Sequence, residues 1–300
     1  MKKKNITKNA SLSVVILTKN RYRLLACCLY SLTQQSILPD EVIIINNGST
    51  DKTESIIAIF SKYLPIKHLN STTNGFPNLY NLGIKSATKP LLSFLDDDCY
   101  AQKNWCKNIL NAHSNNMNCI IQGMSYSYPM NNIFASIMGD HYKNWLEHNT
   151  VDGKLTVIDN KNVSGPTKIW KKFKFNSLAH QGAEDIELGK RFLLAKVPIF
   201  LKKDIAALHR ERSTFNQFLT QHFRIAQSEK TIDNYLQNNK IGTFNKKAIK
   251  NCVSLLKRLK KHAKQLHFFN VLIELYLFLC LILIRILGYF ILKKKVIKYV

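Results

Sequence analysis

The chain has 300 residues, of which 46% are hydrophobic and 21% charged, a composition that excludes intrinsic disorder and supplies a sizeable core. Its formal net charge of +25 favours anionic partners such as nucleotide phosphates, nucleic acid or an acidic membrane surface. No helix-turn-helix, zinc-finger or aromatic RNP-type signature accompanies this charge, so no nucleic-acid partner is expected. The seven cysteines include no C-x-x-C pair, a pattern typical of reduced thiols in the cytosol.

Strands and helices alternate through the first hundred residues. Strands are predicted for residues 12–17 and for "EVIIIN", "IKHLN" and "PLLSFL", with a helix after each of the first three. Asn20 is expected to cap the first helix, and Asp51 with Glu54 has the spacing of a capping box for the second. This alternation predicts an α/β fold with a mostly parallel central sheet flanked by helices.

Polar residues follow the predicted strands: Asn20, residues 46–51 and residues 96–98. Ligands of such sheets bind beyond the carboxyl ends of the strands, so these residues are expected to share one crevice. Asp96 and Asp98 form a D-x-D pattern in which carboxylates can share a divalent cation with a diphosphate. The alternative is that these acidic residues only cap a following helix.

The second half of the sequence is less regular. "QKNWCKNILNAH" predicts a helix and "CIIQGMSYSYP" a strand, whereas residues 130–175 show weak periodicity with Trp145 and Trp170 as expected packing anchors. "AEDIELGKRFLLAK" predicts a helix, and "VPIFLKKDIAALHRERS" predicts two short strands or a hairpin ending at His209.

Glu184 and Asp185 open the helix of "AEDIELGKRF". Carboxylates at that position can serve as ordinary N-terminal caps, because the helix dipole favours negative charge there. They can also provide a general base that deprotonates an attacking hydroxyl. His209 can likewise orient a phosphate or bind a metal, or it can be a structural histidine.

The C-terminal part differs in composition. Residues 250–267 predict a basic amphipathic helix, and the apolar run 268–292 is long enough to cross a bilayer. Glu274 and Arg285 lie inside that run, and each charge near the centre of a span costs about 2.5–3.5 kcal/mol. We therefore expect a helix in or near the membrane interface; a true span and a helix docked on the protein are the alternatives.

Five stretches resemble, in order and spacing, the motifs of family-2 glycosyltransferases: "SVVILTKNR", "EVIIINNGSTDKT", "NGFPNLYNLGIKSA", "LLSFLDDD" and "GAEDIELGKRF…ALH". The resemblance implies a GT-A type nucleotide-sugar-binding fold over residues 11–215. A basic extension (residues 1–10) would precede it, and a helical, membrane-associated region (residues 216–300) would follow. It further implies inverting transfer from a nucleoside-diphosphate sugar, expected to be a UDP-sugar, assisted by Mn2+ or Mg2+.

The resemblance also implies roles for individual residues. It puts Asp185 in the role of catalytic base and Glu184 beside the acceptor. Asp98 and His209 would bind the metal or the diphosphate. The nucleotide sugar would contact Thr18, Asn20, Asn46, Asp96 and Asp97.

Three positions depart from the family pattern. Asn46 stands where many relatives carry an Asp for the base, and Tyr80 stands where an Arg is frequent. "FKFNSLAHQG" replaces the usual aromatic-Asp-Glu stretch before the catalytic base. The diphosphate is therefore expected to meet a cationic residue other than position 80.

The expected acceptor is a glycan or a lipid-linked sugar in surface polysaccharide or lipopolysaccharide synthesis. The basic, apolar C-terminal region suggests a cytoplasmic protein held peripherally or monotopically on the inner face of the cell membrane. A metal-dependent nucleotidyltransferase, which would release pyrophosphate, is the nearest alternative. A basic nucleic-acid-binding protein and a catalytically dead membrane scaffold are more distant ones.

Overall fold

The computed structural model describes residues 11–211 except 74, 115–117, 129–132, 152 and 178–183, together with residues 214, 216, 217, 220, 279 and 283. The chain divides into two units, Met1–Leu178 with Glu184–Arg212, and Ala179–Ala183 with Ser213–Val300. The first unit is the one described below. The predicted basic extension and nearly all of the predicted membrane-associated region lie outside the described residues. Within the described residues, no helix combines the length and apolar character needed to cross a membrane.

An eight-stranded sheet forms the centre of this unit, in the order β3-β2-β1-β4-β9-β6-β10-β5. Six strands share one direction, and β9 and β5 oppose it, each being antiparallel to its neighbours. The prediction of a mostly parallel sheet is therefore confirmed. The strands are β1 (Leu12–Thr18), β2 (Glu41–Asn46), β3 (Ile66–Asn70), β4 (Leu91–Leu95), β5 (Cys99–Ala101), β6 (Ile120–Ser127), β9 (Asn162–Pro166) and β10 (Ile199–His209); β7 (Thr150–Val151) and β8 (Lys154–Leu155) form a separate pair.

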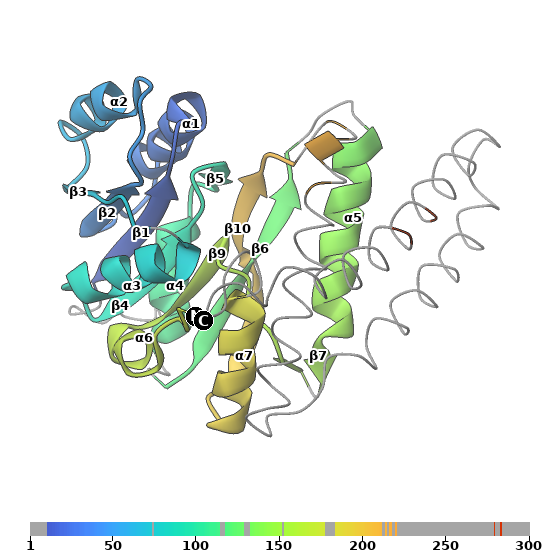
Figure 1. Ribbon diagram of the computed structural model, residues 1–300. Helices are drawn as coiled ribbons and strands as arrows, with labels where there is room; N and C mark the ends of the chain where they lie inside the picture. The colour runs from blue at the N-terminus through green and yellow to red at the C-terminus, as the bar shows by residue number, and fades with distance from the viewer. Residues whose placement is uncertain are drawn as a thin grey trace, which may run out of the picture. The chain divides into compact units, whose positions relative to one another are not determined.

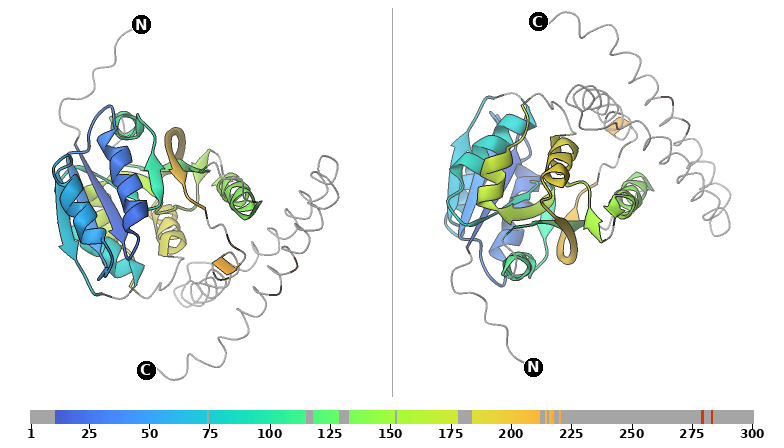
Figure 2. Two further views of the ribbon diagram at one scale, coloured as in Figure 1. Left: turned by 90° about the horizontal axis from the view of Figure 1, so that it is seen from above. Right: turned by 90° about the horizontal axis from the view of Figure 1, so that it is seen from below.

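Helices cover both faces of the sheet (Figures 1 and 2). One buried apolar cluster joins one face to α1 (Tyr22–Thr33), α2 (Thr53–Phe60) and α4 (Trp105–His113). The other cluster joins the opposite face to α3 (Phe76–Ser86), α5 (Ile133–His148), α6 (Thr167–Phe173) and α7 (Glu184–Leu194). In β1, Val14 and Ile16 belong to the first cluster and Val15 to the second, as the two-residue period of a strand requires.

The second half of the chain differs most from expectation. The segment ending at His209 is one strand of eleven residues, with an irregularity between Lys202 and Ala206, so the predicted hairpin or pair of strands is wrong. Strand β9 lies in the region of weak periodicity, where no strand was predicted. Trp170 is fully buried and Trp145 packs against the same core, so the prediction of two packing anchors is confirmed.

One predicted helix cap is wrong, and the other is confirmed in part. The Asn20 side chain accepts a hydrogen bond from the backbone N–H of Thr50 and not from α1. Asp51 accepts from the backbone N–H of Thr53, the first residue of α2, and from that of Tyr22, the first residue of α1. The Glu54 carboxylate accepts from Asn46, so it does not close a capping box. The loops after β1 and β2 exchange these bonds because their strands are paired.

Candidate active site

The loops at one edge of the sheet bring the candidate functional residues together. In Figure 1 the arrowheads of β1, β6 and β10 point toward the same end of the sheet. Thr18, Asn46 and His209 are the last residues of their strands, and Asp96 directly follows β4. Because β9 runs the other way, the residues before its first residue reach the same edge. The crevice expected at the carboxyl ends therefore also receives the segment 157–161, which the sequence did not indicate.

Asp97 is held by two residues of the chain. It is only 2% exposed, and its Oδ2 accepts a hydrogen bond from the Thr18 hydroxyl at 2.8 Å. Its Oδ1 pairs with the Arg21 guanidinium at 2.7 Å. Both carboxylate oxygens are thus occupied within the chain, and the expected contacts of Thr18 and Asp97 with a nucleotide sugar remain predictions.

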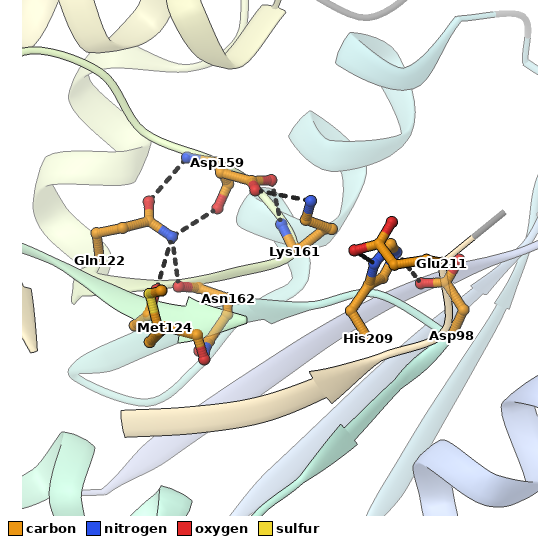
Figure 3. A network of polar contacts seen from close by, with 9 residues as sticks. Asp98, Gln122, Met124, Asp159, Lys161, Asn162, His209 and Glu211 are labelled. Carbon is orange, nitrogen blue, oxygen red and sulfur yellow. Dashed lines mark hydrogen bonds and ion pairs between the residues drawn. The ribbon is translucent and has the colours of Figure 1, made fainter. Parts of the chain in front are cut away.

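One oxygen of Asp98 lacks a hydrogen bond. Its Oδ2 pairs with Arg21 at 2.6 Å, whereas its Oδ1 is buried and has no hydrogen bond. The His209 Nε2 lies 3.4 Å from Oδ1, within ion-pair distance but beyond good hydrogen-bond geometry. Figure 3 shows His209 between Asp98 and Glu211, whose Oε1 lies 2.8 Å from the His209 Nδ1.

The charges of the triplet are only partly balanced. Burial, and after it the neighbouring carboxylates, raise the pKa of Asp96 to about 8. Burial raises the pKa of Asp97 to about 7, although Arg21 opposes the shift. Burial acts in the same direction on Asp98, but His209 and Arg21 outweigh it and lower the pKa of Asp98 below the ordinary value. Near neutral pH Asp98 is therefore an ionised carboxylate whose charge is balanced, whereas Asp96 is mainly protonated.

The positive charge of His209 contributes to balancing the negative charge of Asp98. Burial lowers its pKa, but Asp98 and Glu211 raise it, and the net result is a pKa of about 9. His209 is therefore an imidazolium at neutral pH when no other cation is near. Protonated in this way, it supplies the positive charge that a metal ion would otherwise provide to Asp98.

The segment 157–161 is joined to the triplet by a backbone contact. The N–H of Asp96 donates to the carbonyl oxygen of Lys161 at 3.3 Å. The Lys161 ammonium pairs with Asp159 at 3.1 Å and lies 4.1 Å from the centre of the Tyr142 ring. Gln122 fixes the same segment, because its amide oxygen accepts from the N–H of Asp159 and its amide nitrogen donates to the Asp159 carbonyl oxygen (Figure 3).

The other end of this segment packs against α7. Gly189 lies so close that an added Cβ would come within 2.9 Å of the Val157 Cα, so only glycine allows this approach. Arg191 fixes α7 further by pairing with Glu187 and donating to the carbonyl oxygen of Phe173. Asp185 lies four residues before Gly189, one helical turn toward the site.

Asp185 is electrostatically linked to the segment as well. Burial raises the pKa of Asp185 well above its ordinary value, and the charges of Glu184 and Asp159 raise it further. Asp159 also raises the pKa of Asp96. The segment 157–161 therefore connects the aspartate triplet, through the hydrogen bond between Asp96 and Lys161, with α7, through the contact at Gly189. Such a raised pKa suits a carboxylate that must take up a proton near neutral pH.

Two further predicted binding residues, Asn46 and Asn20, are engaged within the chain. Asn46 is 1% exposed, accepts from the N–H of Ser49 and donates to Glu54. Asn20, which has a positive φ of 52°, binds the neighbouring loop through Thr50. Their predicted contacts with base and ribose stay predictions.

Tyr80 lies in an aromatic cluster. Its ring packs edge-on against Phe94 at 5.1 Å and against Phe175 at 4.9 Å. Burial raises its pKa well above the ordinary value, and the carboxylates of Asp96 and Asp185 contribute, so Tyr80 lies beside both acidic groups. It forms part of an apolar wall and offers no positive charge.

Four functional candidates were missed by the sequence reasoning. Arg21 directly follows Asn20 in "TKNR", so its position at a strand end was a usable signal. Glu211 lies two residues after His209, a spacing that was also visible. Asp159 and Lys161 carried no signal, because the strand that positions them was not recognised.

The residues around Asp98 suit a hard divalent cation. The Asp98 carboxylate, whose pKa is lowered and whose Oδ1 is buried without a hydrogen bond, forms an anionic position for such a cation. No three His, Cys, Asp or Glu side chains in the described part of the chain converge to hold a metal. A cation at Asp98 would therefore complete its ligand shell with diphosphate oxygens and water, as Mg2+ commonly does.

Comparison with known proteins identifies the family. The model of "Glycosyl transferase family 2" matches residues 13–172, more than half of the chain. The chain therefore belongs to glycosyl transferase family 2, a class of enzymes. It is 33% identical to validoxylamine A glucosyltransferase of Streptomyces hygroscopicus subsp. limoneus over 126 residues, which cover 40% of this chain and 28% of that protein. It is 29% identical to chondroitin synthase of Pasteurella multocida over 46% of this chain and 15% of that protein. The matched part is thus less than a third of these relatives.

Solved structures share the fold. A mannosyltransferase from Pyrobaculum calidifontis, in complex with GDP-Man and Mn2+, aligns with a TM-score of 0.67 and 13% identity over 95% of this chain and 88% of that one. S. aureus TarS in complex with UDP-GlcNAc aligns with a TM-score of 0.54 and 17% identity over 75% of this chain and 71% of that one. The fold is accordingly the GT-A-like α/β fold that the sequence predicted.

Proposed function

We propose that the protein transfers a sugar from a nucleoside-diphosphate sugar to a hydroxyl of a glycan or lipid-linked acceptor, with inversion. The observation that carries this proposal is the segment 157–161, which accepts the backbone hydrogen bond of Asp96 at Lys161 and packs against α7 at Gly189, so that it links the triplet to the helix that begins with Glu184 and Asp185. Two fold neighbours were solved with GDP-Man and with UDP-GlcNAc, which supports a nucleotide-sugar donor.

In the proposed reaction Asp185 takes the proton of the acceptor hydroxyl. The acceptor oxygen forms a bond to the anomeric carbon while the bond from that carbon to the diphosphate oxygen breaks, and the nucleoside diphosphate leaves with the electron pair. Asp98, with His209 beside it, would hold Mn2+ or Mg2+, which offsets negative charge on the departing diphosphate. Arg21 is the cationic residue of the chain nearest to Asp98 Oδ2 and can meet the diphosphate in place of the absent Arg at position 80.

The test is the replacement Asp185→Asn, which keeps the shape of the side chain and removes the base. We expect sugar transfer to fall by about 10²–10⁴-fold while donor binding remains. Asp204→Asn, an exposed change on β10, is the matched control and should retain full activity. Retained transfer in Asp185→Asn would remove this residue from the role of base. Release of pyrophosphate from a nucleoside triphosphate would instead favour the nucleotidyltransferase.

A screen must precede this assay, because the donor has to be chosen. Thermal shifts with UDP, GDP and their sugars, each with and without Mn2+, would identify the base and the sugar. Asn46 stands where a carboxylate is frequent in the family, so a preference for UDP has to be measured rather than assumed.

We further propose that the acceptor is presented at the inner face of the cell membrane. The support is the composition of residues 216–300, where a basic helix precedes an apolar run. The full chain should sediment with vesicles that contain anionic lipid at low salt, less so at high salt. Equal recovery in the supernatant with and without such vesicles would contradict this proposal.

A further inference from the structure

One side chain on the segment between the two acidic groups has no partner. Asn160 is 4% exposed, and both its amide oxygen and its amide nitrogen are buried without a hydrogen bond. Buried polar side chains are nearly always hydrogen-bonded, so an amide with neither group satisfied is exceptional. The deficit therefore points to a group that the protein alone does not supply.

The neighbouring amides make the contrast clear. The Asn162 oxygen accepts from the Trp105 indole N–H at 2.8 Å, and its nitrogen donates to the carbonyl oxygens of Met124 and Ile205. Gln122 is also hydrogen-bonded at both ends of its amide. The fold thus satisfies the buried amides on either side of Asn160 and leaves that of Asn160 open.

The location of Asn160 restricts what could bind it. The next residue, Lys161, accepts the backbone hydrogen bond of Asp96, and the preceding residues 157 and 158 touch α7 at Gly189. Asn160 therefore lies on the connection between the aspartates that would face the diphosphate and the helix that carries Asp185. In the proposed reaction, the group between the diphosphate and the base is the sugar being transferred.

We propose that the Asn160 amide binds hydroxyl groups of the transferred sugar and so determines which donor sugar is accepted. A primary amide donates and accepts at once, and a sugar hydroxyl does the same, so one such group can satisfy both amide atoms. A site built to hydrogen-bond a hydroxyl rejects donors that lack it, because its polar groups would stay unpaired. This inference rests on the proposed function.

The experiment compares Asn160→Leu with the wild-type chain. Leucine has the same branching of side-chain heavy atoms as asparagine, although it is larger, and it removes both polar groups. Calorimetric titrations would use UDP, GDP, UDP-glucose, UDP-GlcNAc and GDP-mannose, each with Mn2+. For the donor that binds the wild type best, we expect Asn160→Leu to leave the affinity for the nucleoside diphosphate unchanged. The additional affinity contributed by the sugar should fall about tenfold or more.

A second measurement does not depend on activity. Replacing an unsatisfied buried amide by an apolar group should raise the melting temperature of the ligand-free protein, by about 2–8 °C. The matched variant Asn162→Leu removes a satisfied amide and should lower that temperature. Because leucine is larger than asparagine at both positions, the two variants are compared with each other, and a loss of melting temperature for Asn160→Leu as large as that for Asn162→Leu would overturn the inference.

The remaining outcomes separate the two proposals. If the wild type binds none of the nucleoside diphosphates with Mn2+, the proposed function fails, and this inference fails with it. If they bind and Asn160→Leu discriminates among the sugars as the wild type does, the proposed function stands and Asn160 contacts ordered water only.

Discussion

Asn46 and Asn160 are both buried asparagines at the same edge of the sheet, yet their environments are opposite. The amide of Asn46 is used at both ends, by Ser49 and Glu54, whereas that of Asn160 is used at neither. The loops after β1 and β2 are thus complete without a ligand, and the segment before β9 is not. We infer from this contrast that residues with satisfied polar groups, such as Asn46, hold the site in shape, whereas residues with unsatisfied ones, such as Asn160, are available to bind a ligand.

Replacing Asp98 should have the largest effect on ligand binding, because its Oδ1 is buried without a hydrogen bond in the free protein. We expect Asp98→Ala to weaken Mn2+-dependent binding of the nucleoside diphosphate by about 100-fold, since the cation would lose its carboxylate ligand. Calorimetric titration measures the effect, and a chelator should reproduce it in the wild type. Asp204→Ala is the control. If Asp98→Ala leaves the affinity in the presence of Mn2+ unchanged, Asp98 only holds the site in shape and does not bind the cation.

Asn46→Asp tests whether Asn46, whose amide is hydrogen-bonded at both ends, holds the site in shape. The substitution introduces the residue that is frequent in the family, but here it would put a carboxylate beside Glu54 in a buried position. We expect the free energy of unfolding to fall by about 1–3 kcal/mol, because a hydrogen bond becomes a like-charge contact. Denaturant titration measures the loss. Adding Glu54→Gln to Asn46→Asp should restore most of the lost free energy of unfolding. If it does not, the destabilisation has a cause other than the contact between residues 46 and 54.

Arg21→Met removes the guanidinium that holds Asp97 and Asp98. Arg21 is 43% exposed, so solvent screens the pair and we expect a loss of only about 1 kcal/mol in stability. Arg23→Met, an exposed change two residues further on in α1, is the matched control. If Arg21→Met reduces the binding free energy of the nucleoside diphosphate by more than it reduces the free energy of unfolding, Arg21 contacts the diphosphate.

The smallest expected effect concerns pH. Asp185 must be ionised to accept a proton, so its raised pKa predicts that kcat/KM falls as the pH drops through that value. Glu184→Gln removes one charge that raises this pKa, and the acidic limb of the profile should therefore move to lower pH. Glu147→Gln, an exposed change on α5, should leave the limb in place. If Glu184→Gln does not move the acidic limb of the kcat/KM profile, a group other than Asp185 is responsible for that limb.

The parallel arrangement of the first strands could be predicted because both faces of β1, β2 and β4 are covered. Buried parallel strands appear as continuous apolar runs, and "EVIIIN" and "LLSFL" are of that kind. The aspartates after β4 follow from the same rule, since strand ends collect ligands in such sheets.

The antiparallel strand β9 could not be predicted in this way. Its sequence, "NVSGP", contains Gly165 and ends at Pro166, and both residues normally argue against a strand. It is held by β4 and β6 on either side and by Trp170, which lies 3.1 Å from where a Cβ of Gly165 would stand. Tertiary packing therefore overrides local propensity at this strand.

The sequence by itself determined the alternating α/β pattern, the position of the aspartate triplet after a buried strand, and the pairing of Glu184 with Asp185 at a helix start. Only the tertiary structure decided which of these groups are occupied and which are open. It also brought Arg21, Asp159, Asn160 and Lys161 to the site. Local patterns record burial and helix ends, because these depend on residues a few positions apart. Hydrogen-bond partners far apart in the sequence, such as Thr18 with Asp97 or Asp96 with Lys161, exist only once the sheet has assembled.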